Sequence, residues 1–205
     1  MPSSIKFIRG VMSEQPTIQP AARLVGNKLV LREVEVADAA YILSLRLDPK
    51  KAAYLSAVDA DVARQAAWIE RYKTDGSQAY FIICLKDEAG GAGQPVGTVR
   101  LYNAVGDSFS WGSWIVADGA PTYVGIESAL IVYRYALDHL GFRNAHFEVR
   151  KDNRSVWTFH ERFGAQRVAE DDVEYRFELA HDAILASMGR YARFLPDPID
   201  VVRLD

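Results

Sequence analysis

The feature that most constrains this 205-residue chain is a strand-like run followed at once by a tight turn and a long apolar segment. Residues 108–117 (SFSWGSWIVA) are rich in aromatic and β-branched side chains, which favour strands. Residues 118–137 (DGAPTYVGIESALIVYRYAL) begin as a small polar turn and continue as a helix. Several unrelated folds use this order of strand, turn and helix to point backbone N–H groups at a phosphate. The segment therefore predicts a sheet with a helix packed against it, and the turn is a candidate phosphate site.

Further elements on both sides of this segment predict a mixed sheet. Residues 27–36 alternate between apolar and polar side chains, and residues 79–87 (AYFIICLKD) are almost continuously apolar, as in a strand covered on both faces. The remaining expected elements, in chain order, are helices over 37–48 and 62–74, strands over 96–103 and 144–151, a helix over 154–163, strands over 165–170 and 173–180, and a last helix within 181–195. This order predicts an α/β (α+β) fold with helices on the faces of the sheet.

Polar residues and glycines mark the ends of the expected helices. Asp38 and Asp61 stand near the starts of the first two, and Asn153 is a favourable N-cap for a later one. Gly164 is suited to a helix C-terminus. By contrast, the glycine-rich segment 88–95 (EAGGAGQP) joins two strands and precedes no helix, so we interpret it as a hairpin loop.

Length and composition favour one domain with a sizeable core. The chain is 49% hydrophobic and 25% charged, which is ordinary for a globular protein. Residues 1–23 include three prolines and show little periodicity, so we expect an N-terminal extension there. Residues 24–180 are expected to form the domain, and residues 181–205 a C-terminal helix and tail packed on it.

Charge and hydropathy argue against several classes of partner. A net charge of −3 disfavours nucleic acid, and no apolar run is long enough to cross a membrane. The N-terminus lacks the apolar core of a signal peptide, so we expect a cytoplasmic protein. Cys84 is the one cysteine, and its apolar strand predicts a buried, reduced thiol.

A spacing near the C-terminal half of the chain resembles a known superfamily. In residues 153–165 (NRSVWTFHERFGA), Asn153, Val156, His160 and Gly164 follow one another at steps of three, four and four. Together with the apolar helix and its LG exit, this pattern resembles the GNAT superfamily of acetyl-CoA-dependent N-acyltransferases, and it is most similar to the branch with the ribosomal-protein N-terminal acetyltransferases. The resemblance covers residues 24–179. It implies a mostly antiparallel sheet with helices on both faces, acetyl-CoA as co-substrate and no metal.

The same resemblance assigns the turn to the pyrophosphate of CoA, in a variant form. The family pattern has Arg or Gln, a glycine three residues on, and a small residue two beyond it; here these places hold Thr122, Gly125 and Glu127. A carboxylate at 127 must point away from the phosphates, and we expect it to support the helix start. The implied cofactor contacts are Thr122, Tyr123, Val124, Gly125 and Ile126, with Asn153 as a secondary contact.

The resemblance also suggests where acetyl transfer takes place. The strand before the turn is expected to part from the next strand, and backbone groups of Trp114, Ile115 and Val116 would line the gap. His160 stands where many family members carry a tyrosine that protonates the thiolate, and it is our candidate acid, with a structural histidine as the alternative. Glu148 is our candidate base; a water chain, or a salt-bridged surface role for this residue, stays open.

The acceptor pocket in this fold is shaped by the loop between the first two helices and by the last strands. That loop contains Arg46 and Tyr54, and Trp111 could stack on an acceptor ring or belong to the core. We expect an N-acetyltransferase acting on a primary amine of a small molecule, with an amino-sugar nucleotide as the leading candidate. A protein N-terminal acetyltransferase and a non-catalytic CoA-binding module are the alternatives, and the chain is compatible with a homodimer.

Overall fold

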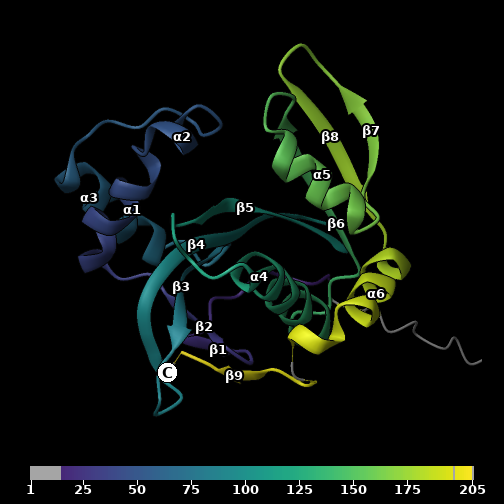
Figure 1. Cartoon of the computed structure of the whole chain (residues 1–205), viewed down its shortest axis with the longest axis horizontal. Coiled ribbons are helices and arrows are strands. Elements are labelled where there is room, and N and C mark those ends of the chain that lie inside the picture. The colour runs from purple at the N-terminus through teal and green to yellow at the C-terminus, as the bar shows by residue number, and fades with distance from the viewer. Residues whose placement is uncertain (1–14, 196, 205) are drawn as a thin grey trace, which may run out of the picture.

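A computed structural model describes residues 15–195 and 197–204, which are built around one nine-stranded sheet (Figure 1). The strands lie in the order β7-β8-β6-β5-β4-β3-β2-β1-β9. Their bounds are β1 Arg23–Val25, β2 Leu29–Glu33, β3 Ala79–Lys86, β4 Ala92–Val105, β5 Ser108–Val116, β6 Asn144–Arg150, β7 Gln166–Glu170, β8 Glu174–Leu179 and β9 Asp200–Val202. Among the described strands, β5 and β6 are the parallel pair and the other neighbours are antiparallel, which confirms the expected mixed, mostly antiparallel sheet.

Helices cover both faces of this sheet, as predicted. They are α1 Ala39–Arg46, α2 Pro49–Ala52, α3 Val62–Lys73, α4 Tyr123–Arg134, α5 Arg154–Arg162 and α6 His181–Arg190. Phe81 and Ile83 of β3 lie in the core cluster that contains α4, whereas Tyr80 and Ile82 pack with α1 and α3. The strand is therefore buried on both faces because alternate side chains enter two different cores.

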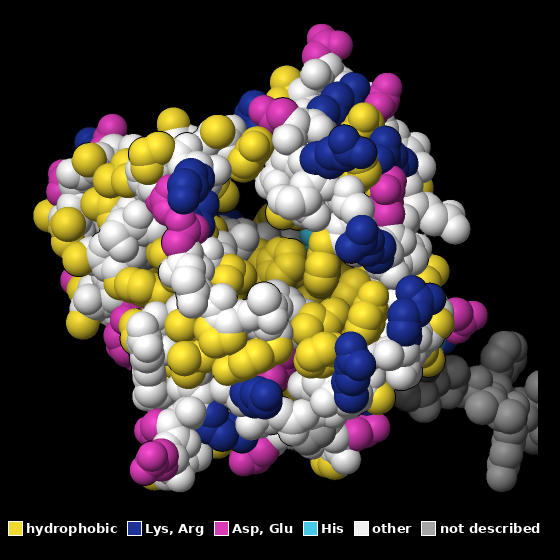
Figure 2. Space-filling view, in the orientation of Figure 1, with side chains coloured by type: hydrophobic (Ala, Val, Ile, Leu, Met, Phe, Trp, Pro, Cys, Tyr) yellow, Lys and Arg dark blue, Asp and Glu magenta, His cyan; other side chains and the backbone are white. Residues whose placement is uncertain are grey.

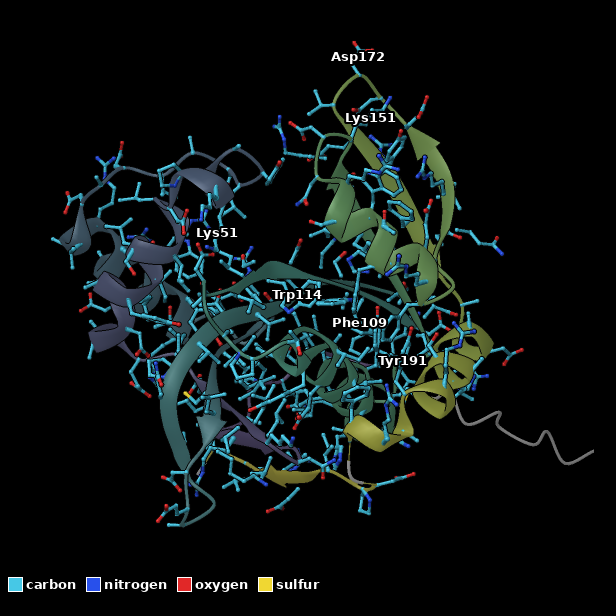
Figure 3. The ribbon with its side chains drawn as sticks, viewed as in Figure 1. Lys51, Phe109, Trp114, Lys151, Asp172 and Tyr191 are labelled. Atoms are coloured by element: carbon cyan, nitrogen blue, oxygen red, sulfur yellow. The ribbon has the colours of Figure 1, made fainter. Side chains whose placement is uncertain are left out.

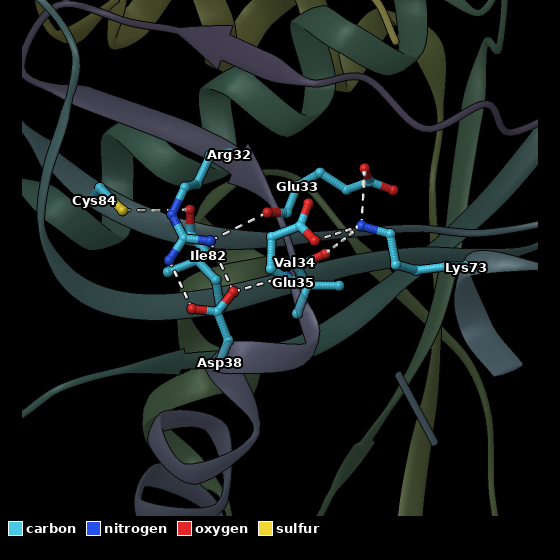
Figure 4. A network of polar contacts seen from close by, with 8 residues as sticks. All are labelled: Arg32, Glu33, Val34, Glu35, Asp38, Lys73, Ile82 and Cys84. Carbon is cyan, nitrogen blue, oxygen red and sulfur yellow. Dashed lines mark hydrogen bonds and ion pairs between the residues drawn. The ribbon is translucent and has the colours of Figure 1, made fainter. Parts of the chain in front are cut away.

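A network of charged groups joins α1 and α3 to β2 (Figure 4). Arg32 donates two hydrogen bonds to the carboxylate of Asp38, each of 2.7 Å, and Asp38 also accepts from the N–H of Glu35 at 2.8 Å. Lys73, near the end of α3, pairs with Glu35 at 2.8 Å. These contacts hold the α1–α3 lobe, which forms one side of the site described below, against the sheet.

Several local expectations are corrected by the structure. Asn153 occupies the N-cap position of α5, but its side chain does not cap the helix and instead accepts from the Ser155 hydroxyl at 3.2 Å; Asp38 lies at the start of α1, as expected, and pairs with Arg32. Asp61 does cap α3, because it accepts from the N–H groups of Ala63 and Arg64. The α-helical part of the long apolar helix ends at Arg134, and a π-helical turn over Tyr135–His139 follows it.

The two ends of the described chain pack on the domain. Ile18 and Ala21 are buried in the main core, and the Tyr135 hydroxyl donates to the carbonyl of Gln19 at 2.7 Å. The tail contributes β9, a strand that we did not predict, at the edge of the sheet beside β1. Residues 1–14 of the expected extension lie outside the described residues.

Candidate active site

The centre of the candidate site is a fork between β5 and β6. Among the described residues these parallel strands pair at two positions, Ser108 with Asn144 and Phe109 with Ala145. Beyond them the strands diverge, so one edge of β5 leaves the ladder. Figure 2 shows a hollow with an apolar floor between the α1–α3 lobe and the lobe of α5, β7 and β8, and Figure 3 shows Trp114 of β5 between the same lobes.

A β-bulge shapes β5 at the fork. Thr98 of β4 pairs with Ile115 and Arg100 pairs with Gly112, so Ser113 and Trp114 together stand opposite a single residue of β4. Ser113 adopts a positive φ of 46°, and its carbonyl accepts a hydrogen bond from the Thr98 hydroxyl at 2.7 Å. A bulge of this kind turns backbone groups out of the regular ladder. The bulge lies beyond Phe109, the last residue of β5 that pairs with β6, so β6 does not cover the bulge.

The turn after β5 leads into the N-terminus of α4 as predicted. Thr122 is the N-cap, and its hydroxyl makes no capping hydrogen bond, so it is not committed to the helix. A Cβ built on Gly125 would meet Trp114 at 3.6 Å, an ordinary contact, so packing does not require glycine at this position. The Trp114 indole donates to the Ser128 hydroxyl, which donates to the Gly125 carbonyl, both at 3.1 Å, and these bonds join the bulge to the first turns of α4.

Glu127 points away from the turn, and this placement corrects its expected role as support for the helix start. Its side chain is 1% exposed, and Oε1 accepts from the N–H groups of Lys28 at 2.7 Å and Leu29 at 3.1 Å. Burial is the main cause that raises the pKa of Glu127, and these backbone hydrogen bonds oppose it. The carboxylate therefore binds β2 and leaves the N-terminus of α4 clear for an anion.

Lysine side chains stand beside the turn. The Lys28 ammonium lies 4.8 Å from the centre of the Tyr123 ring, in the first turn of α4. From α2, Lys51 and Lys50 pair with Asp118 at 2.6 and 3.1 Å. Because carboxylates already neutralise Lys50 and Lys51, the helix dipole and Lys28 are what favour an anion at this end of α4.

His160 lies across the fork, in an aromatic setting. Its ring centre is 4.1 Å from that of Phe147 on β6, 5.3 Å from Trp111 and 6.3 Å from Trp114 on β5. Burial lowers the pKa of His160 to about 3, so the ring is neutral at pH 7, whereas the expected acid role needs the protonated form. The buried Nδ1 has no hydrogen-bond partner among the described residues.

Glu148 stands on the other face of β6, because successive strand residues alternate between faces while Phe147 packs on His160. It is exposed and pairs with Arg176 of β8 at 3.3 Å. Its neighbour His146 bonds the Ser108 hydroxyl at 2.8 Å, and burial lowers the pKa of that histidine. The fold therefore does not bring the two predicted catalytic side chains, His160 and Glu148, together on one face.

The predicted acceptor residues occupy different settings. Arg46 lines a cavity and donates to the carbonyl and hydroxyl of Ser56 at 3.0 and 2.8 Å. Tyr54, in the loop after α2, is 38% exposed. Trp111 is 3% exposed, and its indole donates to the Tyr133 hydroxyl at 3.1 Å, a placement that favours packing over the expected stacking on an acceptor.

Two cavities border β4 and β5, and most of their lining was not predicted from the sequence. One, of about 310 Å³, is lined by Arg46, Ser56, Val58, Gln65, Trp68, Tyr80, Arg100 and Ser113. The second, of about 740 Å³, includes Tyr102, Ser110, His146 and Glu148 in its lining. The two adjoin, because the Arg100 guanidinium lies 4.7 Å from the centre of the Tyr102 ring. Alternation along β4 signals that Arg100 and Tyr102 share a face, but not that cavities lie there.

This sheet, fork and turn define an acetyltransferase of the GNAT type. The family model for the "Acetyltransferase (GNAT) domain" matches residues 28–166, more than half of the chain, and the chain belongs to this family. It is an N-acetyltransferase, and enzymes of this family use acetyl-CoA as co-substrate.

Solved structures agree with this assignment. The structure described as apo FdhC, a nucleotide-linked sugar GNAT, is 38% identical, with a TM-score of 0.75 over 87% of this chain and 100% of that chain. A probable GNAT acetyltransferase from Chromobacterium violaceum ATCC 12472 is 17% identical, with a TM-score of 0.69 over 89% of this chain and 97% of that chain. A GCN5-related N-acetyltransferase from Brucella melitensis is 15% identical, with a TM-score of 0.70 over 89% of this chain and 90% of that chain. The last two show the fold alone. No curated protein matches the sequence.

No helix over 15–195 or 197–204 is long and apolar enough to cross a membrane. Within the same ranges, no group of three or more His, Cys, Asp or Glu side chains is placed to hold a metal ion.

Proposed function

We propose that this enzyme acetylates the amino group of a nucleotide-linked sugar. The observation that carries the proposal is the pair of neighbouring cavities, of about 310 and 740 Å³, along β4 and β5, the smaller of which is lined by the bulge residue Ser113. Cavities of this size suit an elongated organic acceptor better than a small amine. The similarity to the FdhC structure, which is described as a nucleotide-linked sugar GNAT, supports the same class of acceptor.

The co-substrate would lie along the open edge of β5. Backbone groups of Trp114, Ile115 and Val116 would bind its pantetheine arm, as a further strand does. Its pyrophosphate would lie against residues 122–126 at the positive end of the α4 dipole, where the Val124 N–H already donates to the Pro121 carbonyl at 3.0 Å and the N–H groups beside it would bind the phosphates. The inward turn of Glu127 supports this assignment, because it keeps that carboxylate away from the phosphates, and the other carboxylate of the turn, Asp118, is paired with Lys50 and Lys51. Asn153, whose side chain does not cap α5, would add a contact.

Acetyl transfer needs a polarised thioester carbonyl, a neutral amine and a stabilised leaving sulfur. Backbone N–H groups at the bulge would polarise the carbonyl. We infer that His160 acts as a neutral ring that hydrogen-bonds the sulfur, because a pKa of about 3 leaves no charged form to release a proton at pH 7. Glu148 lines the larger cavity and would take the amine's proton through water.

The test is a comparison of acceptors. Initial rates of CoA release from acetyl-CoA would be measured with nucleotide-linked amino sugars, free amino sugars, and peptides with free N-termini. The proposal predicts the highest kcat/KM for a nucleotide-linked amino sugar. Preference for peptides would instead support the ribosomal-protein type of acetyltransferase, and binding of CoA with no turnover would support a non-catalytic module.

A matched pair of variants tests the base. Glu148→Gln is expected to lower kcat at neutral pH, whereas Glu178→Gln removes another carboxylate that lines the same cavity and should leave kcat unchanged. Equal effects of the two substitutions would contradict a specific role for Glu148.

A further inference from the structure

The smaller cavity contains two arginines close together. Arg46 reaches it from the end of α1 and Arg100 from β4, and Trp68, Tyr80 and Gln65 complete the wall around them. The Arg100 guanidinium also lies 5.5 Å from the centre of the Trp68 ring and 4.7 Å from that of Tyr102. Both charged groups are thus held in place by neighbours that do not neutralise them.

Neither arginine has a carboxylate partner among the described residues. One terminal nitrogen of Arg46 donates to Ser56. The buried Nε atoms of Arg46 and Arg100 have no hydrogen-bond partner among the described residues. Burial, and then the charge of Arg100, lower the pKa of Arg46. Two other partly buried arginines are paired: Arg32 with Asp38, and Arg134 with Asp138.

Unpaired guanidinium groups at a partly buried site need an explanation, because removing a charge from water is costly unless a counter-charge is present. An anion bound in the cavity supplies it. Guanidinium groups match phosphate oxygens in geometry, since their planar N–H donors form paired hydrogen bonds. Two adjacent guanidinium groups therefore suit a diphosphate.

The position of the cavity connects it to the reaction. Ser113, the bulge residue with the positive φ, lines the same cavity. We propose that Arg46 and Arg100 bind the diphosphate of the acceptor and so hold its amino sugar beside the bulge. This inference rests on the proposed function, and it names the group by which the acceptor is recognised.

Binding can be tested apart from turnover. Calorimetry would measure the affinity of UDP and TDP for the protein saturated with CoA, so that the pyrophosphate of CoA already occupies its own site. Wild type is expected to bind, and Arg46→Gln and Arg100→Gln are each expected to weaken binding at least about tenfold. Arg71→Gln, an exposed change on α3, should leave affinity unchanged. Unchanged affinity in both cavity variants, or no binding to wild type, would overturn the proposal.

Further measurements exclude misfolding as the cause. CoA affinity should be equal in all variants, and Arg46→Lys and Arg100→Lys, which keep the charge, should bind UDP or TDP with intermediate affinity. With an amino-sugar nucleotide as acceptor, the Gln variants should raise KM far more than they lower kcat. If no amine is acetylated while diphosphate binding still depends on the arginines, the proposed function fails and the diphosphate site stands. If acetylation proceeds and the Gln variants keep the wild-type KM, the diphosphate site is overturned and the proposed function stands.

Discussion

Glu127 of α4 hydrogen-bonds the backbone N–H of Leu29 in β2, 98 residues away in the sequence, at 3.1 Å. The same Oε1 accepts from Lys28 at 2.7 Å, and a Cβ on Gly26 would lie 2.7 Å from it, so the strand turn and the carboxylate fit each other closely. This contact fastens the helix to the sheet. It also withdraws a negative charge from the helix N-terminus, where we place the pyrophosphate of acetyl-CoA.

Loss of this carboxylate should destabilise the fold. Glu127→Ala leaves two backbone N–H groups without an acceptor, at a cost of about 2–4 kcal/mol, whereas Glu127→Gln keeps an acceptor oxygen and should cost less. Urea denaturation of the two variants and wild type measures the free energies of unfolding. An alanine variant as stable as the glutamine variant would show that the hydrogen bonds contribute nothing.

Gly125 should be required by the ligand and not by the fold. Gly125→Ala is expected to stabilise the helix by about 0.5–1 kcal/mol, because the new methyl has room in the protein alone, and to weaken acetyl-CoA binding. Gly189→Ala in α6 is the control: its Cβ meets open space, whereas that of Gly125 makes an ordinary contact with Trp114, and the change should leave acetyl-CoA binding unchanged. Thermal melting and calorimetry give the two quantities. Wild-type affinity in Gly125→Ala would place the pyrophosphate elsewhere.

Burial of His160 should make the protein sensitive to acid. The folded pKa is about 3 and the ordinary value is 6.5, so between these values the unfolded chain binds more protons and stability falls as pH decreases. At pH 5 the loss from this residue amounts to about 2 kcal/mol. His160→Phe should remove that part of the pH dependence, as urea denaturation at pH 7 and pH 5 would show. Parallel curves, or a wild-type imidazole that titrates near 6.5 by NMR, would refute the assignment.

The Thr98 hydroxyl should support catalysis through the bulge. Thr98→Val removes the donor to the Ser113 carbonyl and lets the bulge relax, which we expect to lower kcat about tenfold through misplaced backbone groups. Thr98→Ser keeps a hydroxyl and should keep most of the rate. Acetyl-CoA affinity should change little in either variant. A valine variant with wild-type kcat would show that the hydrogen bond does not shape the site.

Periodicity and local signals were sufficient to predict the main elements of the fold. The run over 79–87 is a strand covered on both faces, and Asp61 caps α3, because these features depend on neighbours in sequence. The contact between Glu127 and Leu29 was not predictable, since a buried carboxylate and a helix-start carboxylate look alike in one sequence. The proximity of Arg46 to Arg100 was not predictable either, because the fold brings α1 and β4 to the same cavity.

The most direct measurement is a calorimetric titration of the wild-type protein with acetyl-CoA, with inorganic phosphate as the control. We expect a saturable interaction in the micromolar range that excess inorganic phosphate does not abolish. Such binding would show that the turn and the fork hold the co-substrate, although Thr122 and Glu127 replace the Arg or Gln and the small residue of the family pattern. Absence of binding at millimolar acetyl-CoA would contradict the assignment of this fork as an acetyl-CoA site.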